Sequence, residues 1–376
     1  MVVRSAFILD DNEWESAHKM AYRMKEVAER AGVSITTVSH VINNTRFVAP
    51  QTRERILNII KELGFYADAH ARRLKSGRSD SFGLIVSDIR NPFFPEIITS
   101  FETAAIQKGF ELYLCNTNYD PARSEGAVRR MIENKVRGVA IMTSEIPSHV
   151  AETLAVHHIP TVFLDVGEVA PYTSNIRVDY SAGIYEAIDH LFRLGHHEFV
   201  FIAGPQNLRS AVVRREAFWD GLCSHGIQNC QIIEGNHRVD GGISAVQSLL
   251  SGSKLATAIL CSNDLTAIGA LSTLQKAGLH IPRDVSVVGF DNIDLASLAY
   301  PPLTTVSLPR DGLGKLAFEA LQNILESERH EGTEYVIKTQ LKIRESTAGI
   351  CLDDESKDGE LDTREPTGIV PEVLAS

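Results

Sequence analysis

Two short helices joined by a tight turn are predicted between Lys25 and Asn43, and this pattern constrains the fold more than any other in the chain. Apolar residues with helical spacing precede Gly32, which can end the first helix because glycine adopts positive φ at little cost. Ser34 follows as the expected N-cap of a second helix, whose apolar positions again repeat with helical spacing. Two helices joined so closely must cross at a large angle, as in a helix-turn-helix.

The outward face of the second helix carries the side chains expected to meet DNA. Thr36 and His40 lie one helical turn apart and Ile35 sits at the helix N-terminus, so all three can point toward base edges in a major groove. An ordinary joint between two helices is the alternative explanation of this turn when it is taken alone. The expected DNA contacts of this motif are Ser34, Ile35, Thr36, Thr37, Ser39, His40 and Asn43.

The charge distribution favours a nucleic-acid partner for this end of the chain. Residues 20–79 carry 11 Lys and Arg against 5 Asp and Glu, whereas the whole chain has a net charge of −11. Pro50 opens a third amphipathic helix that Gly64 can end, and a basic segment with Arg72 and Arg73 follows. A basic module on an acidic body suits phosphate neutralisation, because each paired phosphate releases condensed counterions.

The remaining chain alternates short apolar strands with helices, which predicts a parallel α/β architecture in two similar sets. Two such sets indicate two lobes with a cleft between them, and ligands bind beyond the carboxyl ends of the strands in open α/β sheets. The expected strands cover 81–87, 110–116, 138–142 and 161–165 in the first set, and 199–203, 257–262 and 285–289 in the second.

Polar and aromatic side chains follow several of these strands. Carboxylates and amides can hydrogen-bond the hydroxyls of a polyol, and aromatic rings can cover its apolar face. Each Asn or Asp taken alone is also explained as a turn former at a strand end. The residues at these positions are Asn91, Phe93, Phe94, Asp165, Asn263 and Asp291, with Arg214 on a helix of the second set.

Taken together, these motifs resemble the lac repressor type (LacI/GalR) of bacterial transcription regulators over about 24–347. In the first part the resemblance rests on Val27-Ala28, Ala31-Gly32-Val33-Ser34, Thr37-Val38-Ser39, Val41-Ile42-Asn43, Thr52-Arg53, Ala71-Arg72 and Leu74. In the second part it rests chiefly on Asn91-Pro92-Phe93-Phe94, Ala203-Gly204-Pro205, Asn263-Asp264, Val285 to Asp291 and Pro301-Pro302-Leu303-Thr304-Thr305.

The resemblance implies an N-terminal all-α helix-turn-helix domain followed by an α/β, two-lobed effector domain with parallel sheets, like that of periplasmic sugar-binding proteins. In the hinge, Leu74 beside Arg72 would insert into the DNA minor groove and bend the duplex. Ala49, Ala67 and Asp68 depart from the family pattern at the third helix and the hinge. The implied segments are a flexible extension (1–19), the helix-turn-helix domain (20–66), the hinge (67–79), the effector-binding and dimerisation domain (80–348) and a disordered acidic tail (349–376).

The resemblance also implies an effector pocket between the lobes. Val166 stands where many sugar-binding relatives have Arg, and His237 stands where an aromatic residue is usual. A sugar is the expected effector, a nucleobase is the alternative, and His237 is explained equally well as a plain surface histidine. The pocket residues carried over are Asn91, Phe93, Phe94, Asp165, Arg214, His237, Asn263 and Asp291.

The expected function is a sequence-specific DNA-binding repressor that acts as a homodimer on a pseudo-palindromic operator, in the bacterial cytoplasm at the nucleoid. Relief of repression by the effector is the default polarity, and corepression uses the same linkage with the opposite sign. A periplasmic-type sugar receptor without a DNA role is the alternative, although the Phe7-Ile8-Leu9 run is interrupted at once by Asp10 and Asp11, unlike an export signal.

The sequence contains no motif that is typical of an enzyme, a metal site or a membrane protein. Local signatures of nucleotide, acyl and zinc chemistry are missing, so we expect neither an enzyme nor a cofactor. The five cysteines include no C-x-x-C pair, which fits reduced thiols better than a metal site or a disulfide framework. No membrane-spanning segment is expected.

Overall fold

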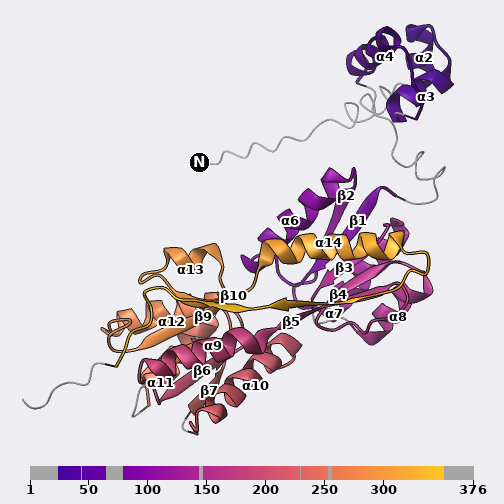
Figure 1. Cartoon of the computed structure of the whole chain (residues 1–376). Coiled ribbons are helices and arrows are strands. Elements are labelled where there is room, and N and C mark those ends of the chain that lie inside the picture. The colour runs from indigo at the N-terminus through magenta and orange to yellow at the C-terminus, as the bar shows by residue number, and fades with distance from the viewer. Residues whose placement is uncertain are drawn as a thin grey trace, which may run out of the picture. The chain divides into compact units, whose positions relative to one another are not determined.

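The computed structural model describes residues 24–43, 45–64, 79–143, 147–228, 230–252 and 256–350. The chain divides into two compact units between Ser79 and Asp80 (Figure 1). The expected N-terminal extension and the hinge residues Arg72 and Leu74 lie outside the described residues. Of the expected tail, only its first two residues are described, and the amide of Ile350 donates to the carbonyl of Leu194.

The first unit contains the three expected helices, α2 (Met24–Ala31), α3 (Ile35–Asn43) and α4 (Pro50–Glu62). Gly32 takes a φ of +63° directly after α2, as predicted for the residue that ends this helix. Ser34 caps α3, since its Oγ accepts from the amide of Thr37 at 3.1 Å. Seven buried apolar side chains, six from the three helices and one directly after α4, form the core: Val27, Ala28, Ala31, Val38, Val41, Ile56 and Leu63.

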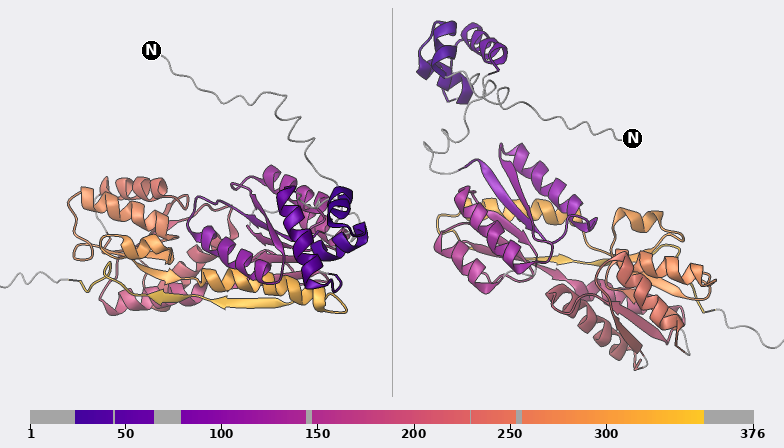
Figure 2. Two further views of the ribbon diagram at one scale, coloured as in Figure 1. Left: turned by 90° about the horizontal axis from the view of Figure 1, so that it is seen from above. Right: turned by 180° about the vertical axis from the view of Figure 1, so that it is seen from behind.

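The second unit consists of two lobes, each built on a six-stranded sheet (Figure 2). In lobe 1 the strand order is β11-β5-β4-β3-β1-β2, and in lobe 2 it is β12-β10-β9-β8-β6-β7. The lobe 1 strands are β1 (Ser81–Val86), β2 (Glu111–Asn116), β3 (Val139–Met142), β4 (Thr161–Leu164), β5 (Thr173–Asp179) and β11 (Glu334–Lys338). The lobe 2 strands are β6 (Phe199–Ala203), β7 (Cys230–Glu234), β8 (Ala258–Cys261), β9 (Ser286–Asp291), β10 (Thr304–Ser307) and β12 (Gln340–Lys342).

Helices cover the sheets of both lobes (Figure 1). Because the sheets are covered, their central strands are buried along their whole length, as in β1, β3, β6, β8 and β9. In lobe 1, Phe318 packs edge-on against both Phe82 and Phe101, which joins α6, α14 and β1. The helices are α6 (Phe93–Gln107), α7 (Pro121–Glu133), α8 (Ser148–Val156), α9 (Tyr180–Arg193), α10 (Arg209–Ser224), α11 (Val239–Leu250), α12 (Asp264–Lys276), α13 (Asp294–Leu298) and α14 (Arg310–Glu326).

The chain crosses between the lobes three times, after β5, after β10 and after β11. The crossings are bonded together, because Thr339 Oγ1 donates to the carbonyl of Asp179 at 2.7 Å and accepts from the amide of Gly183 at 3.0 Å. A Cβ at Gly183 would overlap the side chains of Val306 and Thr339, so only glycine permits this close approach. The three crossings therefore form one packed hinge between the lobes.

All seven expected strands of this unit are present. The sequence analysis missed five strands, β5, β7, β10, β11 and β12, and most of them are short or partly exposed. The expectation of parallel sheets is wrong for one pair, because β12 runs antiparallel to β10 at the edge of lobe 2. The C-terminal part of the chain also returns to lobe 1, where α14 packs on α6 and β11 joins the sheet. This return of the chain to lobe 1 was not predicted.

Candidate functional site

The recognition surface of the first unit is the outward face of α3. Ile35 and Thr36 are exposed and His40 is half-buried, whereas Val38 and Val41 face the core. The His40 ring is oriented by a 2.8 Å hydrogen bond between Nδ1 and Thr45 Oγ1. The structure therefore places the three expected base-reading side chains on one accessible stretch of the helix.

The other expected DNA contacts differ in what the structure shows of them. The hydroxyls of Ser34 and Thr37 bond each other at 2.9 Å within the cap of α3, so both already have a structural role. Ser39 is half-buried on the same helix. Asn43 closes α3, but its side chain, like Arg72 and Leu74, lies outside the described part of the chain.

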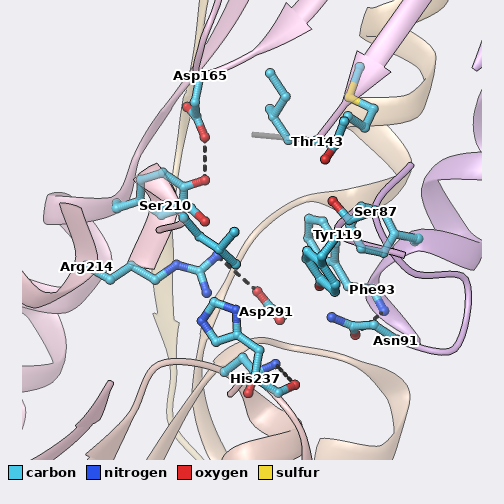
Figure 3. A pocket seen from close by; sticks show the side chains of 16 residues that line it. Ser87, Asn91, Phe93, Tyr119, Thr143, Asp165, Ser210, Arg214, His237 and Asp291 are labelled. Carbon is cyan, nitrogen blue, oxygen red and sulfur yellow. Dashed lines mark hydrogen bonds and ion pairs between the residues drawn. The ribbon is translucent and has the colours of Figure 1, made fainter. Parts of the chain in front are cut away.

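A pocket lies between the lobes, and side chains of both lobes line it (Figure 3). All eight residues expected at an effector site line it: Asn91, Phe93, Phe94, Asp165, Arg214, His237, Asn263 and Asp291. Eight further residues that were not predicted also line the pocket: Ser87, Tyr119, Met142, Thr143, Leu164, Tyr180, Leu208 and Ser210. Several of these also end or follow a strand, so the rule that found the first set could have found them.

Both lobes contribute to the pocket through loops at strand ends. Three lining residues from different loops, Asp165, His237 and Asp291, have positive φ values of 66°, 60° and 104°. Such backbone is costly for residues other than glycine and is found preferentially at functional sites. All three of these residues line the pocket.

Arg214 is the central cation of the pocket. Its guanidinium lies 4.0 Å from the centroid of the Phe290 ring and 4.8 Å from that of Tyr180. Nη1 donates to the carbonyl of Ser262 at 2.6 Å, and Nη2 is 3.5 Å from Asp291 Oδ1 (Figure 3). Nε is buried and has no hydrogen-bond partner, so this fixed cation keeps an unused donor.

Two carboxylates supply acceptors at opposite sides of the pocket. Asp165 accepts from the hydroxyl of Tyr180 at 2.5 Å and from the amide of Val178 at 2.8 Å, and burial raises its pKa. Burial also raises the pKa of Asp291 to about 6, although the charge of Arg214 acts in the opposite direction. The pocket can therefore recognise hydroxyl or N–H groups with two carboxylates, and the charge of Arg214 favours the ionised form of both.

His237 is a buried pocket residue, so the alternative of a plain surface histidine is wrong. Burial and, to a smaller extent, Arg214 lower its pKa to about 3, which leaves the imidazole neutral at physiological pH. Nε2 is 2.8 Å from Ser262 Oγ, and the ring lies so close to Gly204 that a Cβ there would overlap it.

Asn263 positions other residues of the pocket. Its Oδ1 accepts from the amide of Thr266 at 3.0 Å, which caps α12, and its Nδ2 donates to the carbonyl of His237 at 2.9 Å. Both ends of the amide are thus occupied within the protein. Asn263 holds the backbone of His237 in place, and because it also lines the pocket its contact with the effector stays a prediction.

The described ranges contain neither a candidate metal site nor a candidate membrane span. There, no cluster of three or more His, Cys, Asp or Glu side chains is arranged to hold a metal ion. Within the same ranges, every helix is too short or too polar to span a bilayer.

Comparison with known proteins identifies both units. Residues 23–68 match the family model for bacterial regulatory proteins of the lacI family, and residues 188–347 match the periplasmic binding protein-like domain. The HTH-type transcriptional repressor PurR of Photobacterium profundum is 35% identical over 326 residues, which span 86% of this chain and 98% of the relative.

Solved structures agree with the sequence comparison. The lac repressor dimer bound to operator and the anti-inducer ONPF superimposes with a TM-score of 0.78 at 26% identity, covering 87% of this chain and 99% of that one. The complex of the transcriptional regulator CelR with cellobiose gives a TM-score of 0.65 at 28% identity, covering 86% and 99%. The named relatives are regulators, in agreement with the expectation that the chain is not an enzyme. The chain therefore belongs to the lacI family of bacterial regulatory proteins, and it is a DNA-binding transcriptional repressor with a small-molecule effector domain.

Proposed function

We propose that this protein represses transcription from a pseudo-palindromic operator and that a small molecule bound between the lobes controls its affinity for DNA. The observation that carries the proposal is the pocket, since both lobes line it and three chain crossings form its hinge. A ligand that contacts both lobes binds one lobe arrangement better than the other and shifts the population accordingly. Relief of repression is the polarity we propose.

The proposed DNA contacts are those of α3 and of the segment 67–79 that joins the helix-turn-helix domain to the effector domain. Ile35, Thr36 and His40 would read base edges, and Ser34, Thr37, Ser39 and Asn43 would support the approach of the helix to the backbone. Leu74 would enter the minor groove beside Arg72. We propose a homodimer, as in the lac repressor dimer bound to operator, acting at the nucleoid in the bacterial cytoplasm.

The proposed effector is a small polar molecule with several hydrogen-bonding groups and one flat or apolar face. A sugar fits because Asp165 and Asp291 accept from hydroxyls and Phe93 can cover an apolar ring face, and CelR binds cellobiose in a similar fold. A nucleobase is the second candidate. His237 favours this candidate, because its neutral ring can form a hydrogen bond to a planar heterocycle or stack on it. Sugar-binding relatives usually have an aromatic residue at this position.

Two measurements on the full chain test the proposal. Fluorescence anisotropy with the promoter region of its own gene is expected to show specific binding that His40→Ala or Leu74→Ala weakens, and equal affinity for a scrambled duplex would reject the repressor. A thermal-shift screen with a sugar panel and a nucleobase panel then identifies the effector class, because a ligand of the folded state raises the melting temperature. Asp291→Ala is the matched control that should lose the shift.

A further inference from the structure

We propose that Asp88 and Arg238 form a latch, an ion pair that joins the two lobes at the edge of the pocket and favours their closed arrangement. Asp88 belongs to lobe 1, where it follows β1, and Arg238 belongs to lobe 2, directly before α11. Arg238 Nη2 lies 3.5 Å from Asp88 Oδ2. Each residue directly follows a side chain that lines the pocket, Ser87 in one lobe and His237 in the other.

The anionic half of the latch is fixed on lobe 1. Asp88 Oδ1 accepts from Arg90 Nε at 2.9 Å and from the Arg90 amide at 3.1 Å, while Oδ2 accepts from Arg90 Nη2 at 2.8 Å. Arg90 is held in turn by Asn118 Oδ1 at 2.8 Å. Hydrogen bonding from Arg90 lowers the pKa of Asp88, so the carboxylate stays charged although only 4% of the residue is exposed.

The cationic half is fixed on lobe 2 through its backbone. The amide of Arg238 donates to Asn236 Oδ1 at 3.0 Å, and Asn236 Nδ2 donates to Asp240 Oδ2 at 3.3 Å on the first turn of α11. The side chain of Arg238 extends from this turn to a carboxylate on the opposite lobe. An opening of the cleft therefore has to separate two charges that are each anchored to a different rigid body.

The size of the effect follows from solvent exposure and from the competition of Arg90. The Arg238 side chain is 47% exposed, and Asp88 is already neutralised by Arg90, so the pair contributes modestly. Half-exposed pairs of this kind change an equilibrium by about two- to five-fold. The pair needs no ligand, which means that it favours closure before an effector binds and that salt weakens this preference. Its consequence for the effector response rests on the proposed function, whereas the latch itself does not.

Hydrogen exchange of the full chain, without effector or DNA, tests the latch. Arg238→Gln is expected to raise exchange about two- to five-fold in peptides covering 87–94, which lie on the opposite lobe, while Arg238→Lys stays close to wild type. Raising KCl from about 0.05 to 0.5 M should produce the same increase in wild type and little further change in Arg238→Gln. Arg177→Gln is the matched control, because Arg177 pairs with Glu334 at 3.4 Å within lobe 1 and is 51% exposed.

Several outcomes would overturn the latch. Unchanged exchange at 87–94 in Arg238→Gln, or an equal increase in Arg177→Gln, means that the lobes do not depend on this pair. A change confined to 230–250 means that Arg238 only supports the start of α11. Far-UV circular dichroism verifies that each variant folds. If Arg238→Gln does not fold, the KCl series on the wild-type protein still tests the latch, because unchanged exchange at 87–94 would overturn it. Since neither DNA nor effector is present, failure of the latch leaves the proposed function standing, and the reverse also holds.

Discussion

Arg214 Nη2 and Asp291 Oδ1 are 3.5 Å apart, although both side chains are more than nine-tenths buried. This ion pair is long, although burying two charges costs free energy that a long pair does not fully offset. Neighbouring groups must therefore hold the two side chains in place. The rings of Phe290 and Tyr180 and the carbonyl of Ser262 hold the guanidinium in place beside the carboxylate of Asp291. No ligand atom fits between two groups this close, but both residues line the pocket, so a ligand group can bind beside the two charges.

Replacing either partner should abolish the effector response while operator binding survives. Arg214→Ala also leaves Asp291 without its counter-charge, so we expect a stability loss of about 3–5 kcal/mol near pH 8. The loss should be smaller near pH 5, because Asp291, whose pKa is raised to about 6 by burial, then takes up a proton. Urea unfolding at both pH values measures the difference, and equal losses would contradict the assignment of the buried charge.

Because of Asp264, we expect the free energy of unfolding to fall as the pH rises from about 6.5 to 8. Burial and the nearby Asp291 raise the pKa of Asp264 to about 8, so the folded protein keeps a proton that the unfolded chain has released. The pKa of His237 is lowered by burial, so this residue changes the free energy of unfolding only below about pH 6.5. The expected slope due to Asp264 is therefore about 1 kcal/mol per pH unit in this window.

The Asp264→Asn variant provides the matched measurement of this slope. An amide can accept from the Ile293 amide and donate to Thr305 Oγ1, so both hydrogen bonds of the carboxyl group can be kept. The difference in urea-unfolding free energy between the variant and wild type should grow with pH over this window. A constant difference would mean that Asp264 is ionised throughout.

Ile35 and Leu57 allow the recognition surface to be tested with two similar side chains. Both are exposed apolar residues of the first unit, at 48% and 45%, but Ile35 lies on α3 and Leu57 on α4. Ile35→Ala is expected to weaken operator binding by about 1–3 kcal/mol without changing the salt dependence, since no phosphate contact is lost. Leu57→Ala should leave affinity unchanged in the same anisotropy titration. Equal effects would place the interface elsewhere.

The N-caps of α3 and α4 predict opposite effects of two substitutions. Ser34→Ala removes the side-chain cap of α3 and should cost about 1 kcal/mol. Ala49 precedes Pro50 at the start of α4 with no side-chain cap, so Ala49→Ser should stabilise this helix by a similar amount. Native-state hydrogen exchange of the amides in 35–43 and 50–62 reports both changes, and a neutral Ala49→Ser would mean that its hydroxyl does not reach the helix.

The parts of this protein that depend on local rules were predictable from the amino-acid sequence. The end of α2 at Gly32 follows from the φ freedom of glycine, and the cap at Ser34 follows from side-chain chemistry. The buried strands were predictable because covered parallel sheets require continuous apolar runs. The pocket residues were predictable because ligand-binding loops follow strand ends, and the family motifs supplied His237.

The tertiary structure alone decided what depends on contacts between distant segments. Short edge strands such as β7 and β12 carry no continuous apolar run, and their pairing is set by the sheet that they join. The role of Asn263 in holding His237, the packing of the hinge at Gly183 and the pairing of Asp88 with Arg238 all involve residues far apart in the chain. Local propensity cannot specify such contacts, because they exist only after distant segments of the chain have folded and packed together.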